Sequence, residues 1–463
     1  MSMKKTVMLS VLAAAISTSA AGAVSAASAT YTQAQPVTLF INETAASVRA
    51  LSYNGATLLS VRDTGTAAGA RFEVSQNRIL VHFDGRTIEL APSSATVIVD
   101  GEMLQLNTPV VNVKNSLYMD LADIVAVLGV ERTVDSQGQV WIDAANRLQD
   151  VEHPVWLSSG TLLVSQLTDE GRIDYTLDAK SGAYAEVLRS SGTSNLTVAP
   201  GGNKAAYTDE NGAVFVIDLA TKASSQVSGD SSIKPELVWS VDGSAIYFLQ
   251  GDKGSVIAKL NLADGKISKV LEDKVDYKAN LTVSADGKTF AYTVTKPGSV
   301  KADGSKPVES DDVAIDMTGT EPQVYLFDSS VKDAKAVQLT SSTDDKIFAG
   351  LSADGGKAFY ISIVEDKPSA LVSVDKDKTV TTLVGDKDVL QATLLGDKLI
   401  ALTAESNGQA IYEVDAASGS AKLLHIVSDD VSEVIAAAGA PTAIVQNGEV
   451  LIDNDGQWKK LTK

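Results

Sequence analysis

The sequence contains no cysteine and only three histidines in 463 residues. Without cysteine there can be no disulfide, no thiolate metal site, no cysteine nucleophile and no lipid-modified N-terminal cysteine. The histidines, His82, His153 and His425, lie far apart, and none has a second histidine or an acid at the spacing of metal ligands. We therefore expect each histidine to be structural or simply exposed.

Long apolar runs are scarce, and none beyond the N-terminus approaches the ~18 residues that a membrane helix needs. Residues 1–29 are typical of a signal peptide. Lys4 and Lys5 precede an apolar run, and small residues around Ala26 or Ala29 supply a cleavage site. The sequence therefore predicts a secreted protein, extracellular or associated with the cell wall, without membrane insertion.

Basic residues are outnumbered, with 39 Lys and Arg against 58 Asp and Glu and a net charge of -19. Such a charge argues against nucleic acid and anionic membranes as partners. It is compatible with cations, with a basic protein segment or cell-wall component, or with solubility alone.

Catalytic signatures are also missing, because the sequence has no G-x-S-x-G elbow, P-loop, Rossmann fingerprint or complete EF-hand loop. Asp453–Gly456 and Asp375–Lys378 begin like calcium loops but lack the remaining ligands, so we interpret them as tight turns. No cofactor is predicted, and calcium is the alternative. Sequence order cannot show whether a Ser-His-Asp triad or a carboxylate pair forms in space.

The chain does contain a repeated phrase, Ser-x-Asp-Gly followed by an alternating apolar strand. It occurs at Ser240–Gly243, Ser284–Gly287 and Ser352–Gly355, with looser copies around residues 198–207 and 394–400. Asp-Gly between alternating runs predicts a hairpin, and hairpins that recur at ~40 residues indicate propeller blades. Residues 155–463 are therefore predicted to form a β-propeller of seven four-stranded blades, with six as the alternative. The expected blades are 155–190, 195–229, 236–273, 281–342, 348–386, 390–428 and 432–463.

These phrases resemble those of TolB-like propellers. The resemblance covers most of the C-terminal two-thirds of the chain, and it implies a fold rather than a function, because this fold serves partners, ligands and enzymes alike.

Residues 36–145 have an internal repeat of their own, in which Asp123 corresponds to Asp63 and Gly129 to Gly69. Each copy predicts a short helix ended by its glycine and followed by a hairpin. In the second helix we expect Leu121, Ile124, Val125 and Leu128 to form the buried face. The linker 146–153 is expected to act as a short polar hinge.

This region resembles the copper amine oxidase N-terminal-like domain, which is common in exported proteins of Gram-positive bacteria. The resemblance rests on Val97–Gly101, Pro109–Val111, Leu117–Leu121 and Leu128–Val130. It implies a small α+β module and no copper chemistry. Relatives often open the helix with Pro-Leu-Arg, whereas this chain has Ser60–Arg62 and, in the second copy, no arginine.

A propeller separates its connections, because strands a to d of each blade alternate in direction. The a–b and c–d turns share one face, called here the turn face, and the b–c loops and the linkers between blades share the other, the loop face. Sorted in this way, acids gather on the loop face, where we predict a partner-binding surface. Its candidate residues are Asp169, Glu170, Asp209, Glu210, Asp252, Glu272, Asp273, Asp311, Asp312, Asp344, Asp345, Glu365, Asp366 and Asp386.

The longest insertion, Lys296–Glu321, also belongs to the loop face, and it is polar enough to be a mobile binding loop. The alternative is that the acidic loops only keep an exported protein soluble. Trp156, Trp239 and Tyr247 could form a sugar-stacking platform, but we expect them in the blade cores.

The sequence thus favours a secreted, non-catalytic binding or scaffold protein of the cell envelope, mainly β in fold. The alternatives are an extracellular propeller hydrolase or lyase acting on carbohydrate or peptide, and a purely structural envelope protein.

Overall fold

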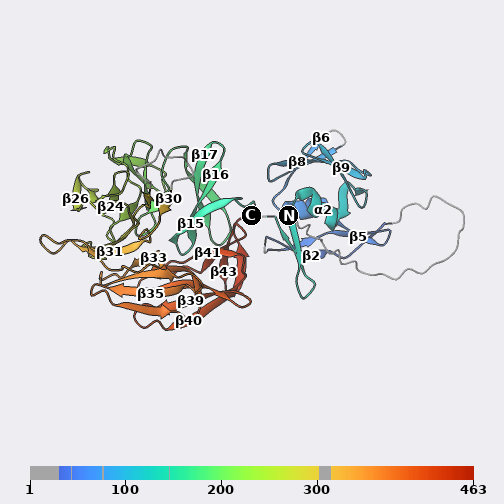
Figure 1. Cartoon of the computed structure of the whole chain (residues 1–463). Coiled ribbons are helices and arrows are strands. Elements are labelled where there is room, and N and C mark those ends of the chain that lie inside the picture. The colour runs from blue at the N-terminus through green and yellow to red at the C-terminus, as the bar shows by residue number, and fades with distance from the viewer. Residues whose placement is uncertain (1–30, 43, 76–77, 145, 302–313) are drawn as a thin grey trace. The chain divides into compact units, whose positions relative to one another are not determined.

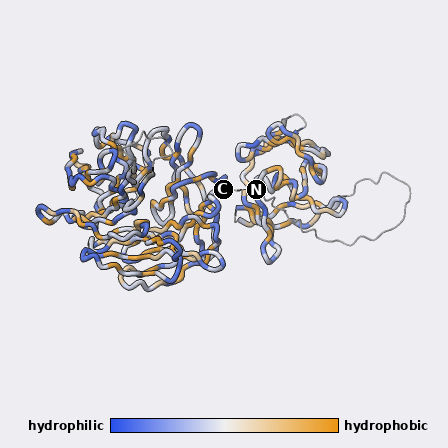
Figure 2. Tube along the Cα trace, viewed as in Figure 1, coloured by the Kyte–Doolittle hydropathy of each residue, from blue (hydrophilic) through white to orange (hydrophobic). Residues whose placement is uncertain are grey.

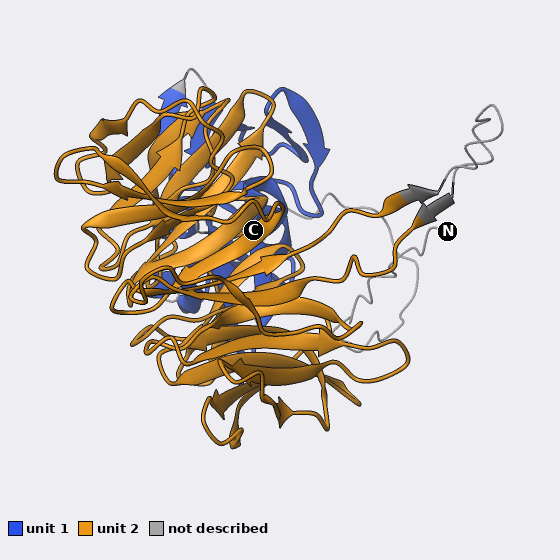
Figure 3. Cartoon of the chain, turned by 60° about the vertical axis from the view of Figure 1, so that its left-hand side comes forward, with its two compact units in different colours: residues 1–146 blue, residues 147–463 orange. Residues whose placement is uncertain are grey.

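The computed structural model describes residues 31–42, 44–75, 78–144, 146–301 and 314–463. The chain divides into two compact units, Met1–Asn146 and Arg147–Lys463 (Figure 3). The predicted fold class is confirmed, because a small α+β unit precedes seven four-stranded sheets in the described part of the second unit. Figure 2 shows apolar stretches within the strands and hydrophilic stretches at the turns.

The first unit contains three sheets and two helices among its described residues. Strands β5 (Ala56–Ser60) and β12 (Ser116–Asp120), one from each repeat copy, pair antiparallel, and each leads directly into a helix. The last strand of the unit, β14 (Val140–Asp143), pairs in parallel with the second, β2 (Val37–Ile41), so an early and a late segment of the unit share one sheet. In spatial order, the first sheet contains β1 (Tyr31–Gln33), β4 (Ala50–Tyr53), β5 (Ala56–Ser60), β12 (Ser116–Asp120) and β11 (Val111–Val113). The second contains β10 (Glu102–Gln105), β9 (Thr96–Val99), β8 (Arg86–Leu90), β7 (Arg78–Phe83) and β6 (Arg71–Ser75). The third contains β13 (Glu131–Val134), β14 (Val140–Asp143), β2 (Val37–Ile41) and β3 (Thr44–Val48).

The helices are α1 (Val61–Ala67) and α2 (Leu121–Leu128), and each is capped by the residue before it. The Ser60 hydroxyl accepts the N–H of Asp63, and the Asp120 carboxylate accepts that of Ala122. Helix α2 ends at Gly129, whose φ of 68° is the left-handed conformation that favours glycine.

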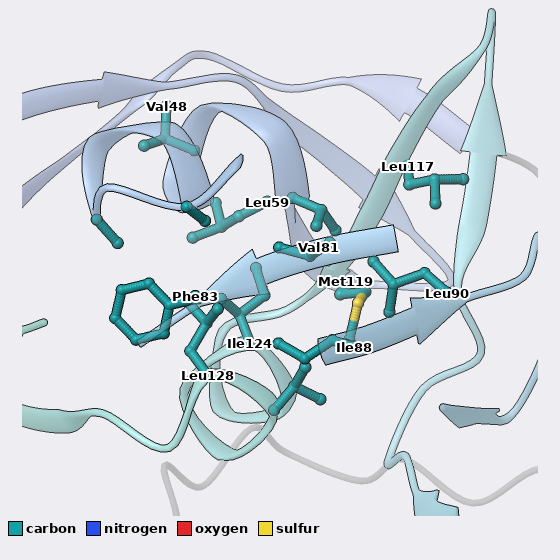
Figure 4. Packing of buried hydrophobic residues seen from close by; sticks show 14 of the residues in the cluster. Val48, Leu59, Val81, Phe83, Ile88, Leu90, Leu117, Met119, Ile124 and Leu128 are labelled. Atoms are coloured by element: carbon teal, nitrogen blue, oxygen red, sulfur yellow. The ribbon is translucent and has the colours of Figure 1, made fainter. Parts of the chain in front are cut away.

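The core of the first unit gathers around α2, with Val81, Ile88 and Met119 packed beside Ile124 and Leu128 (Figure 4). One detail of the prediction was wrong, because Val127 is buried and Val125 only half-buried. The eight-residue helix presents a narrow stripe to the β7–β8 hairpin, and this stripe passes through Val127. The core holds a void of only about 10 Å³, roughly one water in size, so it offers no ligand site.

The second unit consists of seven blades whose strands a to d follow chain order (Figure 1). The first strands of successive blades contact one another, so they form the inner ring of the propeller. The blades are β15 (Val151–Ser158), β16 (Thr161–Thr168), β17 (Gly171–Asp178) and β18 (Tyr184–Ser190); β19 (Thr197–Val198), β20 (Lys204–Thr208), β21 (Val214–Asp218) and β22 (Ser224–Ser228); β23 (Leu237–Trp239), β24 (Ala245–Gln250), β25 (Val256–Asn261) and β26 (Ile267–Glu272); β27 (Lys278–Val283), β28 (Thr289–Val294), β31 (Gln323–Asp328) and β32 (Val337–Gln338); β33 (Asp345–Leu351), β34 (Lys357–Ile363), β35 (Ala370–Asp375) and β36 (Val380–Val384); β37 (Asp388–Leu395), β38 (Lys398–Glu405), β39 (Gly408–Asp415) and β40 (Ala421–Val427); and β41 (Val431–Ile435), β42 (Ala443–Gln446), β43 (Glu449–Asn454) and β44 (Gln457–Lys460).

The ring closes by side-chain packing between blades 1 and 7, since neither blade takes a strand from the other. Trp156 of β15 donates its indole N–H to the carbonyl of Ile435 in β41, at 3.2 Å. Leu162 and Val450 belong to the same buried cluster, and the N–H of Lys463 bonds the carbonyl of Leu148.

The expected hinge at 146–153 is wrong at its C-terminal end, although residues 146–150 lie outside any helix or strand. Strand β15 begins at Val151, and Leu148 and Val151 are buried in the core shared by blades 1 and 7. Burial of these two apolar side chains is more favourable in free energy than their exposure to water in a flexible linker would be.

The insertion in blade 4 is also more regular than predicted. Its two ends pair as an antiparallel ribbon, β29 (Ser299–Lys301) with β30 (Ala314–Asp316). Asp311 and Asp312, two of the candidate acids, lie outside the described residues.

Candidate binding surfaces of the propeller

The aspartates of the repeated phrase are occupied by the turns that they build. In blade 4 the Ser284 hydroxyl donates to Asp286 at 2.7 Å and accepts the N–H of Thr289 at 2.9 Å, while Asp286 accepts the N–H of Lys288. Blades 3 and 5 repeat the same contacts. The Ser240 hydroxyl and the N–H and hydroxyl of Ser244 lower the pKa of Asp242 to about 2. The repeat is thus a structural device and not a site.

A second family of turn acids ends the third strand of several blades. Asp178 accepts the N–H and the hydroxyl of Ser181, and Asp415 does the same with Ser418. These hydrogen bonds lower the pKa of both carboxyl groups. Such Asx-type turns account for much of the negative charge on the turn face.

The candidate acids of the loop face divide into two sets. In the first set the charge is already matched by a buried lysine. Lys278 Nζ lies 2.7 Å from Asp273, and Lys346 Nζ lies 3.0 Å from Asp344, with both lysine side chains fully shielded from solvent. Lys234 pairs with Asp230 in the same way at 2.8 Å. These acids are therefore part of the scaffold.

Two of the buried lysines, Lys234 and Lys278, also tie a linker to a neighbouring loop. Lys234 Nζ donates to the carbonyls of Gly212, Asp230 and Ser232, and Lys278 Nζ donates to those of Ser255 and Val275. Burial raises the pKa of Asp344, but hydrogen bonds from Ser342, Ser362 and Lys346 outweigh it, and the net pKa is lowered.

Our sequence sorting missed these lysines, although a signal was present. Lys234, Lys278 and Lys346 each stand at the same interval before the Asp-Gly of their blade. They also stand at one interval before Phe248, Tyr292 and Tyr360, and the first two rings lie 5.5 and 5.7 Å from the ammonium groups. The repeat is therefore longer than the phrase by which we recognised it.

Three further candidates also have partners within the protein. Glu272 pairs with Lys269 at 2.7 Å, Asp209 accepts the N–H groups of Asn211 and Ala213, and Asp345 accepts the N–H of Lys346. Of these three, only Glu272 has its charge matched by a cation, since backbone N–H donors leave the charges of Asp209 and Asp345 in place.

The second set of candidates is exposed and, within the described part of the chain, has no cation within 4 Å. These acids come from the b–c loops of blades 1, 2, 3 and 5 and from the linker after blade 5. They are Asp169, Glu170, Glu210, Asp252, Glu365, Asp366 and Asp386.

The inner ring holds a separate group of polar side chains. Glu236 accepts the N–H groups of Asn280 and Leu281 in the next blade, both at 2.8 Å. Gln391 of one blade donates its side-chain amide to the carbonyl of Val434 in the next blade and accepts the N–H of the same residue. Burial raises the pKa of Glu433 on β41, while His153 on the adjoining β15 lowers it by a smaller amount.

The aromatic residues lie in the cores, as predicted. Trp156, Trp239 and Tyr247 are each less than a tenth exposed, and Trp239 donates its indole N–H to the carbonyl of Thr197. His425 packs against Trp458, with ring centroids 5.2 Å apart.

In the described ranges, no group of three or more His, Asp or Glu could hold a metal ion. Both calcium-like segments form turns, in which Asp375 accepts the N–H groups of Asp377 and Thr379, and Asp453 accepts that of Gly456. None of the helices in the described ranges is long and apolar enough to cross a membrane.

Comparison with solved structures finds several propellers at low sequence identity. An oligogalacturonate lyase in complex with manganese is 13% identical, with a TM-score of 0.47 over 72% of this chain and 94% of its own. TolB from Acinetobacter baumannii is 15% identical, with a TM-score of 0.38 over 80% and 83%. The propeller domain of the Trilobed protease from Pyrococcus furiosus is 14% identical, with a TM-score of 0.45 over 69% and 97%. These likenesses transfer no activity to this chain.

No curated protein sequence matches the chain. The first unit does have a family match: the model of the copper amine oxidase N-terminal domain covers residues 40–142, which confirms the resemblance inferred from its sequence.

Proposed function

We propose that this chain is a secreted, non-catalytic binding protein of the cell envelope, whose propeller holds a basic protein segment or cationic cell-wall component on its loop face. One observation carries the proposal: the exposed acids of that face, among them Asp252, Glu365 and Asp386, have no cation partner among the described residues. Buried lysines neutralise their neighbours Asp273 and Asp344. Unpaired surface carboxylates attract a cationic partner at little desolvation cost.

The test is salt-dependent capture by the mature protein. Immobilised protein is exposed to isolated cell-wall and secreted fractions at low and high salt. The face variant combines Asp252→Asn, Glu365→Gln and Asp386→Asn. The matched control, Glu102→Gln with Asp333→Asn and Asp455→Asn, removes the same charge elsewhere.

We expect a component that binds at low salt and is released at high salt, with capture lost in the face variant and kept in the control. Capture that survives high salt, or that both variants retain, would contradict the proposal. Equal loss in both variants would show attraction to net charge alone, and would also contradict it.

A second function, an extracellular propeller hydrolase or lyase acting on carbohydrate or peptide, is favoured by Glu433. This half-buried acid lies on the inner ring, and burial raises its pKa, which is the direction that favours the protonated form of a proton donor. Glu433→Gln should abolish any turnover of polysaccharide or peptide substrates while capture by the loop face persists. Turnover that is indifferent to Glu433→Gln would remove Glu433 from such a mechanism.

A further inference from the structure

A cleft of about 710 Å³ opens on the turn face, between blades 5 and 6. It is walled by the a–b and c–d turns of both blades, and Phe359 and Ala416 contribute to its apolar floor. This volume lies within the ~300–1,000 Å³ typical of ligand sites. It lies on the face opposite to the acids of the proposed function.

The cleft exists because the repeat degenerates at blade 6. Between blades 4 and 5 the a–b turns touch, with the N–H of Ala285 bonded to the carbonyl of Ala353 at 2.8 Å. In blade 6 Leu395 pairs directly with Lys398, so Gly396 and Asp397 alone make the turn. This shorter turn leaves the space beside Ala353 unfilled.

One side chain beside the a–b turn is also smaller here. After the Asp-Gly of the phrase stand Ser244 and Lys288 in blades 3 and 4, but Gly356 in blade 5. Two departures from the repeat, the shortened turn of blade 6 and the glycine of blade 5, therefore coincide at one cleft.

The rim of the cleft is acidic. Asp354, Asp375 and Asp415 are held by turn hydrogen bonds. Asp377 and Asp397 are exposed, and their carboxylates have no cation within 4 Å in the described ranges. Lys357 and Lys376 also line the cleft, so the acids outnumber the bases there.

We propose that this cleft binds a lysine or arginine side chain of an extended basic peptide segment, with the aliphatic stem on Phe359 and Ala416 and the cationic head between Asp377 and Asp397. A long cationic side chain fits such a site, because its methylene groups cover apolar surface while its head stays near water and acids. The site is independent of the loop face, so either proposal can fail alone.

The test is calorimetric binding of the peptide Ac-Lys-Leu-Lys-Leu-Lys-NH2 to the full mature protein. The charge variant combines Asp377→Asn with Asp397→Asn, and we expect its dissociation constant to rise about fivefold, as for two partly exposed ion pairs. The filling variant Ala417→Tyr keeps the charge and occupies the volume, and it should weaken binding by at least as much. The matched control, Glu102→Gln with Asp333→Asn, removes the same charge away from the cleft and from the loop-face acids, and should leave the constant unchanged.

Binding that is unchanged in both cleft variants would overturn the proposal. So would equal weakening in the cleft and control variants, because the peptide would then respond to net charge only. A charge effect without an effect of Ala417→Tyr would place the peptide on the rim and outside the cleft, and would also overturn it. Thermal unfolding of each variant verifies that the blades remain folded.

Discussion

Ser284 shows how much one hydroxyl does in the repeated turn. The residue is 1% exposed, and its Oγ both donates to Asp286 and accepts the N–H of Thr289. Ser284→Ala leaves a half-buried N–H without its partner, and should lower the free energy of unfolding by about 1–3 kcal/mol. Urea denaturation measures this change in the free energy of unfolding, with Ser341→Ala at an exposed position as control. Equal midpoints for both variants would contradict the structural role of the turn.

Lys278 should contribute more to the free energy of unfolding, because its shielded ammonium group bonds Asp273 and the carbonyls of Ser255 and Val275. Lys278→Met should destabilise the propeller by about 3–5 kcal/mol, since it leaves the Asp273 carboxylate without its cation partner.

The double variant Lys278→Met, Asp273→Asn should recover part of this loss, and the exposed control Lys367→Met should cost little. These comparisons use the same urea denaturation. If the double variant were as unstable as the single one, the charge of Asp273 would not be the cause.

At the scale of elements, the two helix entries of the first unit share one device. Asp123 accepts the N–H groups of Asn107 and Thr108 and the amide of Asn107, and Asp63 at the matching repeat position accepts the N–H and guanidinium of Arg49. Each acid fastens the segment that precedes it to the start of its helix.

The two positions differ in burial, so their variants should differ. Asp123 is 3% exposed, and Asp123→Ala should cost about 2–3 kcal/mol, whereas Asp63→Ala breaks a more exposed ion pair and should cost about 1 kcal/mol. Native-state hydrogen exchange of the α2 amides measures both costs in the full chain. A larger destabilisation by Asp63→Ala than by Asp123→Ala would show that burial does not determine how much these hydrogen bonds stabilise the unit.

Elements were also the scale at which the sequence was most informative. The Asp-Gly turns and the alternating strands predict every blade, because those signals are local. The role of the buried lysines does not follow from a local signal. Lys278 bonds the carbonyls of Ser255 and Val275 only because the fold brings a linker beside a loop. The cleft escaped prediction for a related reason: it arises from a turn shortened at Gly396 beside a neighbouring blade of normal length.

The whole propeller depends on a closure that no strand exchange secures. Blades 1 and 7 meet through Trp156, Leu162 and Val450 and through the terminal bond from Lys463 to Leu148. Such a ring is held by burial along one seam. Destabilisation of any blade should therefore reach this seam, and this makes global unfolding a fair readout for local changes.

The acid response of the whole molecule follows from the turn acids that recur around the ring. Their pKa values are lowered by hydrogen bonds in the folded state, in Asp242 from the ordinary value of 3.8 to about 2. An acid whose pKa is lower when folded stabilises the protein above about pH 4, and this contribution is lost as the pH falls towards about 2. We expect the free energy of unfolding to decline steeply through that window, as followed by urea denaturation at successive pH values. Asp242→Asn keeps an acceptor but cannot titrate, so its decline should be shallower, whereas Asp333→Asn, outside the repeated turns, should follow the parent protein. Parallel curves for Asp242→Asn and the parent would mean that the repeated turns are not the source of acid sensitivity.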